Sequence, residues 1–431
     1  MQSSHALDRT EITFDDDHSV ANAGLVLTAT LAERLGIEGA VDDTVDLGGR
    51  PGAARPGRKV MTLVQSMVAG GDCIDDADVL RSGATEAVLS HRVMAPSTLG
   101  TFLRSFTFGH VRQLDKVAGT ILARAWAAGA GPGDVPLMID VDSTVCEVHG
   151  YHKQGAAYGY TRTLGLHPVV ATRADTGEVL HVRQRKGSAN TARGAVLFMG
   201  EVVARVRRAG ATGAITVRAD SGFFSERFLG TCKRLQVSFS VTVRQTPQVK
   251  EAIAAIPEGD WTPIDYTDRG EAQLAETTYK GDRLIVRRTR LIGPQAELWP
   301  DWRHHAFLTD RDGDAVALDA DHRRHAVTEL AIRDLKEGTG MNHCPSGRFF
   351  ANSAWLVLAA LAHNLLRWTC SLGLGIDGPV VAKSVRRRFI ALPGRLTRSA
   401  RRRTLHLPSH WPWQQGFLAA VARLRALPQL A

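Results

Sequence analysis

The sequence has 431 residues, 44% of them hydrophobic and 23% charged, with a formal net charge of +9. This composition excludes a disordered chain, and the length predicts two to four modules. The five cysteines stand singly, which excludes a disulfide framework or a zinc ribbon. The start lacks a secretory signal and the longest apolar stretch, 355–366, is too short to cross a bilayer, so we expect a cytoplasmic protein without a membrane partner.

The first 130 residues are predicted to form a helical region. Apolar residues recur at helical spacing over 23–35, 60–69, 98–106 and 117–128. A Gly/Pro-rich break at 48–58 interrupts these helices, and a second break near residue 136 ends the region.

From about residue 131 the pattern changes to alternating strands and helices. Strands are predicted at 137–148, 164–172, 179–185, 214–219 and 237–243, and helices at 192–208 and 225–235. This order predicts a mixed α/β sheet. A turn-rich segment of alternating strands at 245–310 interrupts the core, so that 131–244 and 311–372 are its two parts. Helices resume at 320–336 and 349–370.

Three aspartates of this core follow or end predicted strands. Asp140 and Asp142 stand two apart in the apolar run LMIDVDSTV, so a strand places both carboxylates on one face. Asp220 follows the strand at 214–219, at the end where α/β sheets gather their ligands. A buried carboxylate is costly unless it is paired or binds a cation. Taken alone, each could equally cap a turn, and Asp220 could cap the helix beginning near Ser225.

A polar stripe on the helix predicted at 320–336 adds another carboxylate. Its members, at positions i, i+3, i+7 and i+14, are His322, His325, Glu329 and Lys336. They fall within one stripe of a helix, and no clean apolar stripe remains elsewhere on it, so burial against a polar ligand is expected.

Carboxylates from three different elements form a hard oxygen site suited to Mg²⁺ or Mn²⁺. Two such ions about 4 Å apart can activate the attacking oxygen and stabilise the leaving oxygen of a phosphodiester. The residues therefore predict a metal site built by Asp220, Glu329 and either Asp140 or Asp142, with basic neighbours to hold phosphates.

In this order, the motifs resemble the DDE transposases of bacterial insertion sequences, in the group with a β-strand insertion domain and a Y-x2-R-x3-E-x6-K signature. The D-S-T context at Asp142 and the D-S-G-F context at Asp220 match the family's first two acids. The four signature positions are occupied by His322, His325, Glu329 and Lys336. Together with HGYHKQGAAYGYTRTLGLHPVVA, KGSAN at 186–190 and FFANSAWLVLAALAHNLLRW, they are most similar to the insertion-sequence group numbered thirteen-eighty.

The resemblance implies a fold of class α/β, with a ribonuclease-H-like mixed sheet. A β-rich insertion domain (245–310), a helical N-terminal region (1–130) for DNA-end binding and a basic C-terminal region (373–431) complete it. It implies that Asp142, Asp220 and Glu329 hold two ions, with Asp140 as the alternative first acid. Metal-activated water then hydrolyses a phosphodiester at the transposon end, and the freed 3′-hydroxyl attacks target DNA. The implied partners are the terminal inverted repeats, the target DNA and a second copy of the chain.

Basic residues are the expected DNA contacts. The arginine-rich stretch 383–403, after which no acidic residue occurs, favours a polyanion as partner. The resemblance places Lys336 at the phosphate near the cut. The expected DNA-binding residues are Lys336, His325, His322, Arg333, Arg386, Arg387, Arg388, Arg401, Arg402 and Arg403.

Some assignments stay open. In related enzymes an aromatic residue of the insertion holds a flipped base, so Trp261, Trp299 and Trp302 are candidates, although packing inside a small β domain explains them equally. A nuclease of the same fold that does not join strands needs the same acids. The two histidines at the Tyr and Arg positions of the signature would agree with an inactive transposase that only binds DNA.

Overall fold

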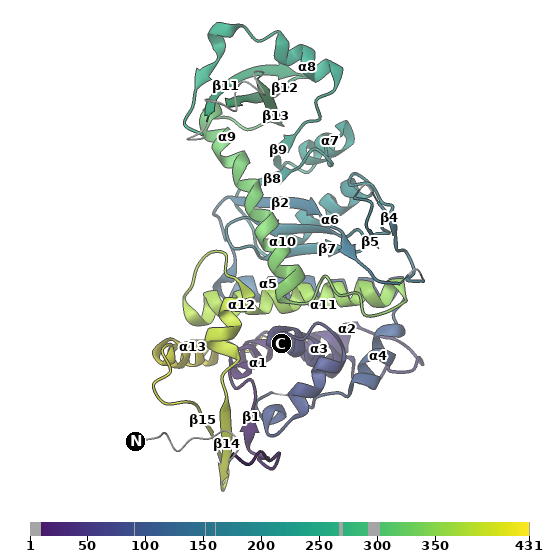
Figure 1. Cartoon of the computed structure of the whole chain (residues 1–431), viewed down its shortest axis with the longest axis vertical. Helices are drawn as coiled ribbons and strands as arrows, with labels where there is room; N and C mark the ends of the chain where they lie inside the picture. Colours follow the sequence, from purple (N-terminus) through teal and green to yellow (C-terminus); the bar gives the residue numbers. More distant parts are fainter. Residues whose placement is uncertain are drawn as a thin grey trace.

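The computed structural model describes residues 10–89, 91–150, 152–159, 161–266, 270–291 and 302–430. The molecule is elongated, with the strands of a large sheet in one half and the N-terminal helices in the other (Figure 1). The helix α11, Phe349–Trp368, lies between the two halves.

The N-terminal region is helical. Its helices are α1 Leu25–Arg34, α2 Ile37–Thr44, α3 Pro56–Ala69, α4 Pro96–Arg104 and α5 Phe108–Ala125. Short 3-10 turns at Asp75–Arg81 and Thr85–Val88 join them, and a π-helical turn at Trp126–Ala130 follows. Four predicted helices are confirmed as α1, α3, α4 and α5. The short α2 went unpredicted because it restarts directly after α1 at Gly36, which takes a left-handed conformation (φ 62°).

The C-terminal region packs on these N-terminal helices. Its elements are α12 Ala382–Val385, a π-helical turn Arg386–Ile390, β14 Gly394–Ser399, β15 Arg402–His406 and α13 Gln414–Ala426. The short strand β1, Ser19–Val20, pairs with β14 and so joins the two ends of the chain. At Gly24 a Cβ atom would stand 1.7 Å from the carbonyl oxygen of Phe389, so this close approach of the two regions requires glycine.

The core sheet has the strand order expected of a ribonuclease-H-like fold. Its five core strands are β2 Leu137–Ser143, β6 Val169–Arg173, β7 Val179–Arg183, β8 Ile215–Ala219 and β9 Ser238–Thr242. They lie in the order β7-β6-β2-β8-β9. Strand β6 is antiparallel to its neighbours, whereas β2, β8 and β9 are parallel to one another. This mixed sheet confirms the predicted fold class.

Two of the predicted strands are in fact divided. The run at 137–148 contains β2 and the separate β3, Cys146–Glu147, and the run at 164–172 contains β5, Leu164–Leu166, and β6. Together with β4, Ala157–Tyr158, the strands β3 and β5 form a small second sheet. Pro168 lies between β5 and β6, and proline cannot donate to a strand ladder, so the chain changes sheet there.

The predicted insertion extends the core sheet at its β9 edge. Its elements are α8 Pro247–Ala254, a 3-10 turn Glu258–Asp260, β10 Thr262–Pro263, β11 Gly270–Tyr279, β12 Asp282–Leu291 and β13 Arg303–Thr309. Strand β13 pairs antiparallel with β9, which makes one nine-stranded sheet. These strands and α8 form the far end of the molecule (Figure 1).

Helices cover both faces of the core sheet. The helices α6, Ala195–Arg208, and α7, Glu226–Arg234, lie behind the sheet in Figure 1. On the front face, α9, Ala315–Arg323, and α10, Val327–Gly338, follow the insertion. The helix predicted at 320–336 is confirmed in position, although a 3-10 turn at Arg324–Ala326 divides it into the end of α9 and α10.

The apolar helix α11 passes through the interior. With the turn that follows it, it is long and apolar enough to cross a membrane by length and composition, but most of it is buried inside this fold, as in the core helix of many soluble proteins. Its polar residues tie it to the edge of the sheet. His363 Nε2 lies 3.0 Å from the Gly177 carbonyl oxygen, and the Asn364 amide bonds both the N–H and the carbonyl of Val179 at 2.8 Å.

Glu178, at the start of β7, makes stability depend on pH. Its carboxylate accepts hydrogen bonds from the indole N–H groups of Trp126, at 3.0 Å, and Trp368. Burial nevertheless raises the pKa of Glu178 from 4.5 to about 7. The folded state therefore holds the proton more tightly, and the stability that it contributes is present below pH 4.5 and lost as the pH rises toward 7.

We expect the free energy of unfolding of the wild-type chain to fall by about 3 kcal/mol, relative to Glu178→Gln, between the two ends of this range. Urea unfolding at a series of pH values measures the difference. Parallel pH profiles of the two proteins would contradict it.

Candidate active site

Asp142 and Asp220 lie side by side at the ends of two parallel strands. In the ladder between β2 and β8, Asp140 stands opposite Arg218 and Val141 opposite Ala219. The next positions are Asp142, still in β2, and Asp220, just beyond β8. Because alternate residues of a strand share a face, Asp142 points to the same side of the sheet as Asp140. The strand register alone therefore brings the two predicted acids together.

Each of these carboxylates accepts a hydrogen bond from a backbone N–H at or just beyond the end of its strand. Oδ1 of Asp142 accepts a hydrogen bond from the Ser143 N–H at 2.6 Å, and Oδ1 of Asp220 accepts one from the Gly222 N–H at 3.0 Å. Asp220 does not cap α7, because the N-cap is Ser225, whose side chain accepts from the Phe228 N–H. Among the described residues, one oxygen of each carboxylate thus remains without a backbone donor.

Helix α10 brings the third carboxylate, Glu329, across the same face of the sheet (Figure 1). Asp142 lies close enough to the other two acids for their charges to act on its pKa. Burial raises the pKa of Asp142 to about 6, and the negative charges of Asp220 and Glu329 raise it as well. The structure thus gathers the three predicted acids from two strand ends and a helix.

The donor set fits divalent cations. Three carboxylates that repel one another are stabilised by a hard cation such as Mg²⁺ or Mn²⁺. Within the described ranges, the one group of three potential ligands with all atoms within 4.8 Å of one another is Asp72, Cys73 and Asp76. The three core acids do not form such a group in this structure.

Asp140, the alternative first acid, has another role. Arg218 donates to both of its oxygens, from Nε at 2.7 Å and from Nη2 at 2.8 Å, and His325 Nδ1 lies 2.8 Å from Oδ1. Asp140 and Arg218 are only 1% and 2% exposed. Burial acts to raise the pKa of Asp140, but the hydrogen bonds from His325 and Arg218 lower it overall. With both oxygens occupied, Asp140 is poorly placed to bind an ion, so the structure does not support the alternative assignment.

The two signature histidines face different surroundings. His322 is buried, with Nδ1 2.8 Å from the Ser240 hydroxyl and Nε2 2.9 Å from the Thr242 hydroxyl, and it stacks on Phe307 at 4.1 Å. This position contradicts the expected DNA contact of His322. The predicted stripe still faces the sheet, but at its His322 end the two hydroxyls of β9 occupy both ring nitrogens.

His325 and Lys336 stay close to the acids. His325 is partly exposed, its Nδ1 faces Asp140, and its charge acts on Asp142. Lys336 Nζ donates to the Thr144 hydroxyl at 3.2 Å and to the Val145 carbonyl at 2.9 Å, just beyond the end of β2. Arg333 is exposed on α10. Contacts of these three residues with DNA stay a prediction.

The C-terminal arginines divide into two groups. Arg386 donates to the carbonyls of Val68, Met67 and Gly338, which end α3 and α10, so its guanidinium holds the fold together and is less available for the predicted DNA contact. The others are exposed, namely Arg387, Arg388, Arg401, Arg402 and Arg403. The last three belong to the hairpin β14–β15, at the end of the molecule remote from the insertion (Figure 1). Their contacts with DNA stay a prediction.

Two of the predicted base-stacking residues pack on an arginine. The guanidinium of Arg288 lies 4.1 Å from the ring centre of Trp261 and 4.6 Å from that of Trp302, and Arg288 also pairs with Glu258 at 2.6 Å. This arrangement agrees with packing inside the β-rich segment. Trp299 lies outside the described residues.

Two residues that hold the end of β2 and Asp140 in place, His167 and Arg218, were not predicted from the sequence. His167 is buried, and its ring nitrogens lie 3.0 Å from the Ser143 hydroxyl and 2.6 Å from the Ala189 carbonyl, so it joins the end of β2 to the KGSAN loop. Arg218 is the buried partner of Asp140. An arginine in the middle of the apolar strand ITVRA was the available signal, because a buried charge needs a partner.

A model of the family described as "Transposase DDE domain group 1" matches residues 3–429. Among solved structures, one similar chain belongs to the cryo-EM structure of a piggyBac transposase synaptic complex with hairpin DNA. It is 13% identical, with a TM-score of 0.45, and the match covers 86% of this chain and 79% of that one. No curated protein matches the chain.

Proposed function

We propose that this chain, which belongs to the family of DDE transposase domains of group 1, cuts DNA at the ends of an insertion sequence and joins them to target DNA. The observation that carries the proposal is the meeting of Asp142, Asp220 and Glu329 on one face of the sheet. The narrower similarity to the insertion-sequence group numbered thirteen-eighty stays a prediction, as does action in the bacterial cytoplasm.

The three carboxylates would hold two Mg²⁺ or Mn²⁺ ions. When bound, such ions activate the attacking oxygen and stabilise the leaving oxygen of a phosphodiester. The chain supplies the geometry for this chemistry. The backbone N–H groups of Ser143, at the end of β2, and of Gly222, after β8, hold Asp142 and Asp220, and α10 carries Glu329 over them.

The reaction would proceed in two displacements at phosphorus. In the first, water attacks the phosphodiester at the transposon end, a P–O bond forms, and the bond to the 3′-oxygen breaks. In the second, that 3′-hydroxyl attacks a phosphodiester of target DNA and displaces another 3′-oxygen. Each step exchanges one P–O bond for another, so no external energy source is needed.

Cationic groups beside the acids would position the DNA. Lys336 and Arg333 present positive charge on α10, and His325 is oriented by its hydrogen bond to Asp140. Contacts of this kind hold phosphate oxygens and fix the register of the backbone. A synaptic complex would contain two DNA ends and, as proposed here, two copies of the chain.

We expect Lys336→Met to weaken binding of a DNA end by about tenfold or more, because one charge-assisted hydrogen bond is worth about 1.5–3 kcal/mol. Titration of labelled end DNA at fixed salt measures the affinity. Lys116→Met is the matched control, since Lys116 is exposed but lies on α5, outside the basic stretch. Equal losses in the two variants would contradict a specific role for Lys336.

A strand-transfer assay tests the whole proposal. The purified chain is incubated with Mg²⁺, a DNA fragment that carries the ends of its own element, and a supercoiled target plasmid. Transposition predicts cleaved ends and joined products. Cleavage without joining would instead indicate a nuclease of the same fold, and binding without cleavage a retired transposase.

A further inference from the structure

A groove on the sheet face opposite α10 has no part in the proposed chemistry. It lies between α5, α6 and α7 and has a volume of about 1000 Å³. A second hollow of about 550 Å³ continues it, since both are lined by Val196, Thr231 and Arg234. Small residues line much of it, namely Gly119, Ala123, Gly200, Ala204 and Gly230. The two hollows form one elongated groove.

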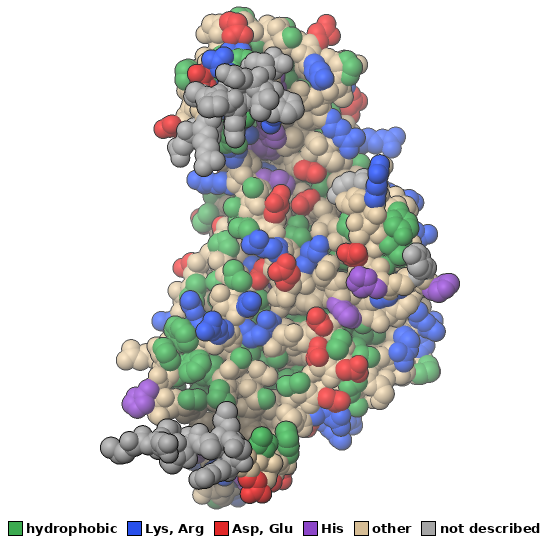
Figure 2. All heavy atoms as spheres, in the orientation of Figure 1, with side chains coloured by type: hydrophobic (Ala, Val, Ile, Leu, Met, Phe, Trp, Pro, Cys, Tyr) green, Lys and Arg blue, Asp and Glu red, His purple; other side chains and the backbone are tan. Residues whose placement is uncertain are grey.

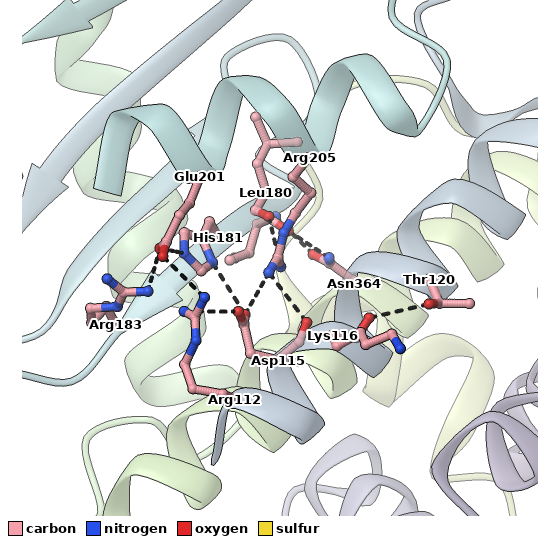
Figure 3. A network of polar contacts seen from close by, with 11 residues as sticks. Arg112, Asp115, Lys116, Thr120, Leu180, His181, Arg183, Glu201, Arg205 and Asn364 are labelled. Carbon is pink, nitrogen blue, oxygen red and sulfur yellow. Dashed lines mark hydrogen bonds and ion pairs between the residues drawn. The ribbon is translucent and has the colours of Figure 1, made fainter. Parts of the chain in front are cut away.

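An ion-pair network holds the base of this groove (Figure 3). Arg205 of α6 reaches Asp115 of α5 at 2.6 Å. His181 of β7 lies between the two acids, 3.2 Å from Asp115 and 3.0 Å from Glu201. Arg112 bridges α5 to α6 through Glu201 at 3.0 Å. The network fixes the spacing of the helices, so the groove exists before anything binds to it.

The same network leaves the groove with an excess of positive charge. Asp115 and Glu201 are both matched by cations, and Glu226, at the far end, pairs with Lys280. By contrast, four exposed cations on its rim have no acidic partner in the described part of the chain, namely Lys116, Arg208, Arg227 and Arg234. Leu197 is 63% exposed among them. The groove therefore suits a ligand that carries acidic and apolar groups together.

The N-terminal segment 10–17, which we call the arm, has this composition. Its sequence is TEITFDDD, so Ile12 and Phe14 alternate with or adjoin four acids. Ile12 is 79% exposed and Phe14 is fully exposed. Large apolar side chains this exposed in a short acidic segment are typical of a segment that orders on binding a partner.

We propose that the arm of one copy docks in the α5–α6–α7 groove of a second copy. Ile12 and Phe14 would lie on the small residues of the groove, and the acids of the arm would face the rim cations, so that apolar contacts give affinity and charge gives register. In its own chain the arm leads into β1, in the half of the molecule away from α6 and α7, which favours exchange between copies (Figure 1). A DNA duplex would leave the apolar floor and Leu197 unused.

The proposal is tested with a fluorescent peptide of residues 10–18 and the full-length chain. We expect the peptide to bind, and the affinity to fall at least about tenfold for a Phe14→Asp peptide and for the Lys116→Glu/Arg208→Glu chain. Arg425→Glu, an exposed arginine on α13, is the matched control and should bind as the wild type does. Equal peptide affinity for the wild type and the Lys116→Glu/Arg208→Glu chain would overturn the proposal.

Sedimentation of the full-length protein separates exchange between copies from other occupants. We expect the wild type to dimerise and the Phe14→Asp chain to shift toward the monomer. Arm exchange would be overturned if the wild type stays monomeric at all concentrations. It would also be overturned if Lys116→Glu/Arg208→Glu weakens DNA binding but not peptide binding. These measurements need no cleavage, so they stand apart from the transposase proposal.

Discussion

The Asp142→Asn variant is expected to cleave DNA at least about a thousandfold more slowly than the wild-type chain while remaining folded. The substitution keeps the size of the side chain but removes one negative charge from the metal site. Metal ions contribute several kcal/mol of transition-state stabilisation, and each 1.36 kcal/mol is a factor of ten in rate. Single-turnover cleavage of an end-containing fragment in Mg²⁺ measures the loss.

The same variant should be at least as stable as the wild type when no divalent ion is present. Burial and the charges of Asp220 and Glu329 raise the pKa of Asp142 to about 6, so its ionised form is disfavoured in the empty cluster. Asparagine removes that repulsion. Added Mg²⁺ should then raise the melting temperature of the wild type but not of Asp142→Asn, because a ligand stabilises only the state that binds it.

These two readouts separate a metal site from a merely structural carboxylate. If Mg²⁺ stabilises both proteins equally, the ions are held elsewhere. If Asp142→Asn cleaves DNA at the wild-type rate, the assignment of the first acid is wrong. Glu329→Gln should also lose cleavage and the stabilisation by Mg²⁺, because Glu329 acts on Asp142. It should stay folded, because Glu329 is exposed and has no hydrogen bond in the described structure.

The sequence predicted the acids better than it predicted their neighbours. Strand ends and the contexts of Asp142 and Asp220 are local features, and the register between β2 and β8 then places the two carboxylates together without further assumptions. Periodicity within a single segment was also enough for α1, α3, α4 and α5.

The errors arose where long-range packing decides the structure. Periodicity places His322 and His325 on one stripe, but only the packed structure shows that the hydroxyls of β9 occupy both ring nitrogens of His322. Arg386 belongs to a basic run that favours a polyanion, but two helix ends supply the carbonyls that it binds. The choice between Asp140 and Asp142 depended on Arg218, which lies 78 positions from Asp140 in the sequence.

The opposite behaviour is expected at Asp140, two residues from Asp142. Asp140→Asn should lower the free energy of unfolding by about 3–5 kcal/mol, because it removes the closest counter-charge of the buried guanidinium of Arg218 and leaves only Asp321, at 3.4 Å. Urea unfolding measures the loss, and Mg²⁺ should still stabilise the variant. Any fall in cleavage should follow the fraction of folded protein and the loosened His325.

A double substitution distinguishes the ion pair from a simple packing effect. Replacing both partners by apolar side chains, in Asp140→Leu/Arg218→Met, removes the two charges together, and replacing a buried ion pair in this way is often neutral or stabilising. We expect the double variant to recover most of the stability lost in Asp140→Asn. A double variant as unstable as the single one would show that the hydrogen bonds from Arg218 to Asp321, and not the charge of Asp140, hold this side of α9 to the sheet. Asp140 and Asp142 share a strand and a face, so the partners that each one meets separate a structural carboxylate from the one that we propose to be catalytic.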